Sequence, residues 1–330
     1  MRNELDQQLA SAASEAQAAA QTLDGSAVAP SRNEPDTAHP SASVSPQAPA
    51  EERPRHRCVE LGRAVVITSG KGGVGKTTVT ANLGTALADA GKRVVVVDAD
   101  VGLRNLDVVM GLENRIRKHS LDVIEGHASL DEALVRDRVR KMLALLPAAQ
   151  NRDKDEIAPE AMRALVAELQ ERFDFVLIDC PAGIEQGFRN AVAGAQEAII
   201  VTTPEVSAVR DADRVAGLLS GAIAPKLILN RIRPQLVKRG SMLNVDDVLD
   251  ILRLELIGVV PDDKDVIVAT NRGAPVVDIA GSETGAAFRR IAARMLGEAL
   301  PIPALSDRSP WFARMFASLP FGKRSSTRGS

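Results

Sequence analysis

Short apolar runs alternate with longer amphipathic stretches between residue 63 and about residue 300. Continuous apolar runs of strand length are typical of parallel strands that are buried on both faces of a sheet. The stretches 77–91 and 158–172 have helical character, and Gly91 stands where the first of these helices would end. This alternation predicts an α/β fold with a doubly wound, mostly parallel sheet of about seven to eight strands in one domain. The runs are AVVIT, RVVVVD, LALL, FVLID, AIIVTT, KLILN and LIGVV.

The two ends of the chain differ from this central part, which we place at residues 62–300. Residues 1–61 are rich in Ala, Ser, Pro and charge, and Val28 and Val44 are the only larger apolar residues from 25 to 57. Such a segment buries too little surface to offset its ordering entropy, so we predict a disordered extension. Its Ser and Ala content favours a targeting leader, whereas its acidic residues favour an untargeted tail, and both remain open.

Composition excludes several classes of protein. Lys and Arg total 41 against 43 Asp and Glu, so the net charge of −2 gives no general affinity for nucleic acid. The two cysteines, Cys58 and Cys180, form no CxxC motif, which argues against a disulfide framework, a zinc site or an iron–sulfur cluster. We expect Cys180 to be small core filler. No apolar run approaches the roughly 18 residues that a membrane-spanning helix needs.

The segment GKGGVGKT at residues 70–77 matches the phosphate-binding pattern GxxxxGK[S/T] in full. It follows a predicted strand and opens a predicted helix, which is the context that a P-loop requires. Backbone N–H groups of such a loop surround phosphate oxygens, while Lys76 is expected to reach the β- and γ-phosphates and Thr77 to bind Mg²⁺. ATP and Mg²⁺ are therefore the predicted cofactors. The predicted contacts are Gly70, Lys71, Gly72, Gly73, Val74, Gly75, Lys76, Thr77 and Thr78.

Three carboxylates follow apolar strands. Asp179 ends FVLID and is the candidate to support Mg²⁺, although a strand-end carboxylate by itself is more often simply solvated. Asp98 and Asp100 follow the strand RVVVVD. They point to opposite sides if the strand continues, or both reach the site from a turn; an acidic cap for the next segment is the alternative. One would support Mg²⁺ while the other orients the attacking water.

A second lysine, Lys71, lies at the start of the P-loop. Lys76 and the loop backbone are already expected to contact the phosphates of the nucleotide bound there. A cation there is placed to reach outward to a nucleotide held by a second subunit, as an arginine finger does in trans. A solvated loop lysine explains the spacing equally well.

The segment PWFARMFASLPF near the carboxyl end places its large apolar residues on one side of a predicted helix, and basic residues follow it. A short amphipathic helix of this kind suits insertion into an anionic membrane interface. A helix packed on its own domain is the alternative. The predicted membrane residues, within a linker and tail at 301–330, are Trp311, Phe312, Met315, Phe316 and Leu319.

The segment SGKGGVGKTT resembles the deviant Walker A motif of the ParA/MinD family of P-loop ATPases, to which nitrogenase iron protein also belongs. The resemblance covers about residues 63–297. Its motifs are more similar to those of the cyanobacterial and plastid branch of the septum-site-determining members than to the commonest bacterial form. The other segments on which the resemblance rests are DADVGLRNLDVVMGLENR, LIDCPAGIEQGF, VTTPEVSAVRDADRV, LILNRIRP and GVVPDDKDVIVATNRGAPV.

The resemblance implies a role for several positions. Lys71 would be the signature lysine that acts across a nucleotide-sandwich dimer, and Asp100 would position water in a first switch that also holds Asp98. Asp179 would begin a second switch. Asn105 would lie near the dimer face, Asn230, Pro261 and Asp262 near the adenine, and Arg210, Asp211 and Asp213 on a dimer and partner surface.

The function implied is a peripheral membrane ATPase that is switched by dimerisation and positions the division site. It would form a homodimer with ATP, bind an anionic membrane, and act with a MinE-like topological factor and, where present, a MinC-like inhibitor. The long extension favours a plastid protein, with the bacterial cytoplasm and inner membrane face as the alternative. Competing functions are a ParA-type DNA-partitioning ATPase and a flagellar-number regulator, while an iron–sulfur carrier is disfavoured because paired cysteines are lacking.

Overall fold

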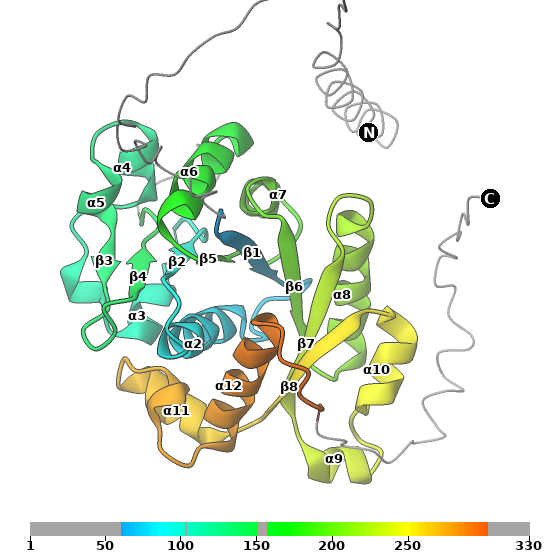
Figure 1. Cartoon of the computed structure of the whole chain (residues 1–330). Coiled ribbons are helices and arrows are strands. Elements are labelled where there is room, and N and C mark those ends of the chain that lie inside the picture. Colours follow the sequence, from blue (N-terminus) through cyan, green and yellow to red (C-terminus); the bar gives the residue numbers. More distant parts are fainter. Residues whose placement is uncertain (1–60, 103, 151–156, 303–330) are drawn as a thin grey trace, which may run out of the picture. The chain divides into compact units, whose positions relative to one another are not determined.

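The computed structural model in Figure 1 describes residues 61–102, 104–150 and 157–302. The predicted extension before Leu61 and the predicted membrane helix with Trp311, Phe312, Met315, Phe316 and Leu319 lie outside the described residues.

A sheet of eight strands forms the centre of the described part, in the order β3-β4-β2-β5-β1-β6-β7-β8. All neighbouring strands pair in parallel except β3, which runs antiparallel to β4 at one edge. The predicted doubly wound, mostly parallel sheet is therefore confirmed, and each of the seven apolar runs became a strand. The strands are β1 (Arg63–Thr68), β2 (Val94–Asp98), β3 (Val135–Arg136), β4 (Leu143–Leu146), β5 (Phe175–Asp179), β6 (Glu197–Thr202), β7 (Pro225–Ile232) and β8 (Glu255–Pro261).

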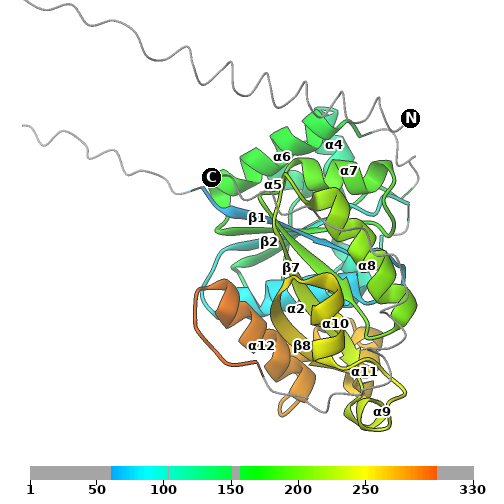
Figure 2. The same cartoon turned by 90° about the vertical axis from the view of Figure 1, so that its right-hand side faces the viewer.

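Helices cover both faces of the sheet, as Figure 2 shows for α6 and α7 on one side and α2 and α12 on the other. The first face carries α4 (Ser120–Ile124), α5 (Leu130–Ala133), α6 (Pro159–Arg172), α7 (Gln186–Ala193), α8 (Val206–Leu219), α9 (Pro234–Lys238) and α10 (Val245–Leu252). The second carries α2 (Lys76–Asp89), α3 (Leu106–Met110), α11 (Lys264–Asn271) and α12 (Glu283–Met295). Two short 3₁₀ turns, η1 (Glu113–Arg115) and η3 (Val276–Asp278), complete the described elements.

Each central strand contributes to two cores. In β2, Val95 and Val97 pack into the core beneath α6 and α8, whereas Val94 and Val96 pack into the core beneath α2 and α12. All four side chains are fully buried. Since both faces are covered, neither face selects polar residues, which explains why these strands read as unbroken apolar runs.

The carboxyl ends of the parallel strands share one edge of the sheet, which we call the carboxyl edge. Asp98 at the end of β2 is the register partner of Asp179 at the end of β5, and Asp179 is also the partner of Ile67 in β1. The chain continues from β1 into the P-loop and then into α2. The pairing of these three neighbouring strands therefore brings the P-loop and two of the predicted carboxylates together.

Candidate nucleotide-binding and catalytic site

Two glycines of the P-loop stand where a side chain would not fit. A Cβ atom on Gly70 would lie 2.2 Å from the backbone oxygen of Asp211 in α8. Gly75 has a φ of +99°, and a Cβ atom there would lie 2.4 Å from Nδ2 of Asn230. The loop is thus held closely between the start of α8 and the end of β7, with its backbone available to phosphate groups.

The side chain of Lys76 points into the loop. Only 8% of the residue is exposed, and Nζ donates a hydrogen bond to Ser69 Oγ at 3.0 Å. The Ser69 hydroxyl in turn donates to the backbone oxygen of Lys71 at 2.8 Å. The ammonium group of Lys76 therefore lies within the P-loop, and its contact with the β- and γ-phosphates stays a prediction.

The predicted metal-supporting groups lie together. The side chain of Thr77 hydrogen-bonds Asp179, and the Thr80 hydroxyl lies 3.2 Å from the same carboxylate. Burial raises the pKa of Asp179 to about 6, although Thr77, Lys76 and Thr80 oppose the shift. Burial, together with the charge of Asp179, raises the pKa of Asp98 to about 8. A cation bound here would favour the ionised form of both carboxylates.

This donor set fits Mg²⁺. The hydroxyl of Thr77 and the carboxylates of Asp98 and Asp179 are hard oxygen ligands, and Mg²⁺ usually keeps several waters and adds phosphate oxygens to one or two such groups. Among the described residues no cluster of three or more His, Cys, Asp or Glu side chains is arranged to hold a metal ion alone. The arrangement therefore suits a metal that arrives with a nucleotide.

Asp100 approaches the site from a turn. β2 ends at Asp98, and the backbone N–H of Asp100 donates to Asp98 Oδ1 at 3.0 Å. The charge of Asp100 acts on both Asp98 and Asp179. Of the two geometries left open by the sequence, the structure has the turn, which directs both carboxylates to the same region.

Lys71 lies apart from Lys76. Its Nζ donates to Ser207 Oγ at 3.2 Å and lies 3.9 Å from Glu205 Oε2, at the start of α8. Its side chain is 45% exposed. The first lysine therefore leaves the loop on the side of α8, while the second stays inside it.

The predicted adenine and dimer residues are spread around this centre. Asn230 is 5% exposed and donates from Nδ2 to the backbone oxygen of Val74 at 2.8 Å. Pro261 ends β8, and Asp262 is exposed and accepts a hydrogen bond from Arg233 at 2.6 Å. Asn105 is exposed at the start of α3. Asn230 thus supports the P-loop, while its predicted contact with the adenine, and the contacts of the other three with nucleotide or partner, stay predictions.

Several supporting residues escaped the sequence reasoning. Ser69 and Thr80 flank the P-loop motif, so their positions were a usable signal. Glu205 and Ser207, in contrast, meet Lys71 only because β6 and α8 pack beside the loop. Cys180 is buried, as expected for core filler, and burial raises its pKa to about 12.

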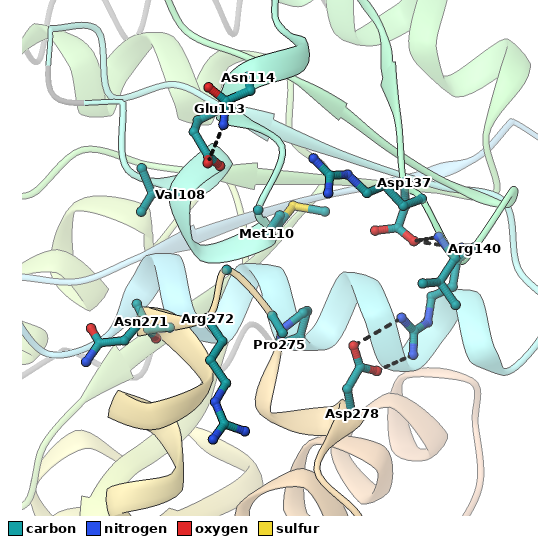
Figure 3. A pocket seen from close by; sticks show the side chains of 16 residues that line it. Val108, Met110, Glu113, Asn114, Asp137, Arg140, Asn271, Arg272, Pro275 and Asp278 are labelled. Carbon is teal, nitrogen blue, oxygen red and sulfur yellow. Dashed lines mark hydrogen bonds and ion pairs between the residues drawn. The ribbon is translucent and has the colours of Figure 1, made fainter.

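A pocket of about 440 Å³ lies elsewhere, between α3, the turn that joins β3 and β4, and the segment after α11. Figure 3 shows Arg140 and Asp278 pointing toward each other at one end of it. None of the predicted nucleotide, metal or catalytic residues lines this pocket. It is therefore separate from the P-loop site. Among the described residues, no helix has the length and apolar character to cross a bilayer.

Comparison with known proteins agrees with this site. Residues 65–276 match the family model of the CobQ/CobB/MinD/ParA nucleotide binding domain. Since the match covers more than half of the chain, the protein belongs to this family, and its complete P-loop makes it an ATPase of that class.

Individual relatives show to which family within this class of ATPases the chain belongs. The septum site-determining protein MinD of Synechocystis is 57% identical over 244 residues, which cover 73% of this chain and 92% of that protein. At this identity and coverage, the chain belongs to the MinD family of septum site-determining proteins.

Two solved structures share the fold. MinD in a MinC:MinD cell division protein complex from Aquifex aeolicus has a TM-score of 0.69 and 47% identity, over 74% of this chain and 99% of that one. MinD from Pyrococcus horikoshii, complexed with Mg-ADP, has a TM-score of 0.65 and 32% identity, over 71% of this chain and 96% of that one.

Proposed function

We propose that this ATPase positions the division site by switching between a single chain and an ATP-bound homodimer that docks on the membrane. The observation that carries the proposal is the separation of the two lysines. Lys76 is buried inside its own loop, whereas the half-exposed Lys71 is held by Ser207 and Glu205 outside it. A lysine in that position is able to turn outward and reach a nucleotide on a second chain.

Hydrolysis then depends on charge and position. The P-loop backbone and Lys76 hold the phosphates, and Lys71 from the second chain offsets the charge that develops during phosphoryl transfer. Thr77, Asp98 and Asp179 would hold Mg²⁺, which neutralises phosphate charge when bound. Asp100 in the turn after β2 orients the attacking water. This arrangement makes the rate depend on pairing of two chains.

Dimerisation would also control membrane attachment. One copy of the predicted aromatic helix with Trp311, Phe312 and Phe316 would provide only marginal affinity for a bilayer. Two copies on one dimer bind far more tightly, because the second contact becomes intramolecular. The dimer therefore docks, and hydrolysis releases it.

Partner proteins would act on this cycle. The Aquifex relative was solved with MinC, which supports a MinC-like inhibitor as one partner. A MinE-like factor that stimulates hydrolysis is the second partner we propose, and α8 with the exposed Arg210 offers a surface beside Lys71. Similarity to the MinD proteins of Guillardia theta and Chlorella vulgaris supports a plastid setting, and similarity to that of Bacillus subtilis supports a bacterial one. In either setting we propose that the chain is a peripheral membrane protein.

Vesicle sedimentation tests this proposal. We expect the full chain to bind anionic vesicles with Mg-ATP and far less with Mg-ADP, and a chain truncated before Ser309 to stay in solution with either nucleotide. Binding that ignores the nucleotide would contradict the switch. Duplex DNA added at low salt serves as the test of DNA partitioning, and tight, salt-sensitive DNA binding would favour that function instead.

Imaging tests the compartment. A fluorescent fusion of the full chain is expected in plastids of a plant or algal host, and removal of residues 1–57 is expected to abolish that location. A cytoplasmic signal from both fusions would place the protein outside plastids.

A further inference from the structure

A second charged surface lies at the amino ends of the parallel strands, opposite the nucleotide site. A hollow of about 210 Å³ is formed there by the β3–β4 hairpin, the residue before β2 and the end of α6. We call it the hairpin pocket. Its lining includes four cations and one acid, and a phenyl ring lies among them. These are Arg93, Arg136, Lys141 and Arg172, with Asp131 and Phe173.

Two of the four cations are already neutralised. Arg93 forms an ion pair with Asp174 at 2.6 Å. Arg172 pairs with Asp131 at 3.2 Å and with Glu168 at 2.7 Å. These contacts fix the two guanidinium groups on the walls of the pocket.

The other two cations are not neutralised by the described residues. The guanidinium of Arg136 lies 5.6 Å from the ring centre of Phe173, which orients it without removing its charge. Lys141 forms no ion pair with any described residue, and both side chains are exposed. The pocket therefore presents two positive charges that suit a phosphate group.

Exposed apolar side chains belong to the same hairpin as these charges. Met142, which precedes β4 and lines the pocket, is 46% exposed, and Val139 in the hairpin turn, which lines the 440 Å³ pocket, is 79% exposed. Cations next to exposed apolar groups are the combination that binds the interface of an anionic bilayer.

The last described segment leaves the domain at the same edge. Arg63 at the start of β1 donates to the backbone oxygen of Met295, and Arg294 donates to the backbone oxygens of Leu300 and Pro301. Residues 296–302 are thus anchored near the amino ends of the strands, at the edge of the sheet that carries the hairpin pocket. The chain continues from there toward the predicted membrane helix.

We infer that the hairpin pocket binds the headgroup phosphate of an anionic phospholipid, with Val139 and Met142 touching the interface. This folded-domain contact would turn the amino ends of the strands toward the bilayer and the nucleotide site away from it. The inference rests on the proposed membrane docking and adds a second lipid contact to the predicted helix.

Charge reversal tests the pocket in the full chain. The variant Arg136→Glu/Lys141→Glu is compared with Lys238→Glu/Arg239→Glu, which makes the same change in net charge on the exposed end of α9, beyond the carboxyl end of β7. Sedimentation with Mg-ATP and phosphatidylglycerol vesicles is expected to show at least fivefold weaker binding for the pocket variant and less than twofold for the control. Each cation near an anionic surface contributes roughly a fivefold effect. Equal binding by the two variants would overturn the inference.

A soluble probe separates this inference from the proposed switch. Dihexanoyl-phosphatidylglycerol, below its micelle concentration, is titrated into the full chain and into both variants. We expect binding that the pocket variant loses and the control keeps, even if the parent chain fails to dock on vesicles. If only the tail truncation loses vesicle docking, and the pocket variant binds the soluble lipid as the parent does, the lipid site in the hairpin pocket is refuted. The proposed membrane switch is then unaffected. Inorganic phosphate that binds as tightly as the lipid would refute a lipid site.

Discussion

Asn230 acts on the nucleotide site through the backbone of the P-loop. Its amide donates to the Val74 carbonyl, and its Nδ2 atom occupies the space in which a side chain on residue 75 would lie. A buried, directed hydrogen bond of this kind fixes the loop in the conformation that phosphate needs. An amide at the end of a predicted apolar strand was visible in the sequence, but the group to which it donates was not.

We predict that Asn230→Ala lowers the free energy of unfolding by about 1–2 kcal/mol, because a buried carbonyl loses its donor. Affinity for a fluorescent ATP analogue should fall several-fold, since the loop is less well held. Urea unfolding and nucleotide titration measure the two effects. Asn114→Ala, at an exposed amide, is the control and should change neither.

At the scale of single elements, Arg140 joins three segments that are distant in sequence. It lies in the β3–β4 turn and pairs with Asp89 at the end of α2 and with Asp278 in η3, each across 2.6 Å or less. Its side chain is only 14% exposed, whereas the two carboxylates are partly exposed. Figure 3 shows the contact with Asp278. One guanidinium thus holds the edge hairpin against the α2 face of the sheet.

Replacing Arg140 with Met should therefore destabilise the fold. Two acids would lose their shared cation, and we expect a loss of roughly 1–2 kcal/mol, reduced from the value for a buried pair because the carboxylates are partly solvated. Arg138→Met, in the same turn and without an ion pair among the described residues, should cost less than about 0.5 kcal/mol. Equal denaturation midpoints for the two variants would show that the three-way contact contributes nothing.

A second ion pair links β1 to β6 and makes stability depend on pH. Arg63 donates to both oxygens of Glu197, at 2.6 and 2.8 Å, and this hydrogen bonding holds the pKa of Glu197 below its ordinary value. A depressed carboxylate pKa stabilises the fold above the unfolded pKa of about 4.3, and this contribution is lost as pH falls through the folded pKa.

The variant Glu197→Gln should consequently be less stable than the parent at pH 7, by less than about 1 kcal/mol because the pair is partly exposed. The difference should shrink below pH 4. Urea unfolding at pH 7 and at pH 3.5 measures it. A difference that stays constant between these two pH values would contradict the assignment.

The elements differ in how well the sequence revealed them. The seven long strands, α2 and α6 were evident from burial on both faces and from helical spacing. β3 has only two residues and pairs through the hairpin, so it carries no periodicity of its own. The P-loop and its acids follow from local motifs, whereas the contact of Lys71 with Ser207 spans 136 positions and depends on how α8 packs.

At the scale of the whole molecule, the nucleotide site and the inferred lipid site lie at two opposite edges of one sheet. The carboxyl edge holds the P-loop, Lys71 and the acidic residues, and the amino edge holds the hairpin pocket and the exit toward the tail. A dimer that pairs nucleotide sites would leave the opposite edges available to lipid. Pairing and docking would then use separate surfaces, and one ATP-dependent event would connect them.

We propose that Lys71 acts on the nucleotide that the other chain binds. A mixing experiment addresses it directly, with Lys71→Ala and Asp100→Ala chains that are each expected to be inactive. If Lys71 acts in trans, a mixed dimer holds one complete site. The Lys71→Ala chain keeps Asp100 in that site, and the Asp100→Ala chain supplies Lys71 to it. We predict that ATP hydrolysis, measured with anionic vesicles present, returns when the two inactive chains are mixed. A mixture as inactive as its components would show that Lys71 does not act in trans.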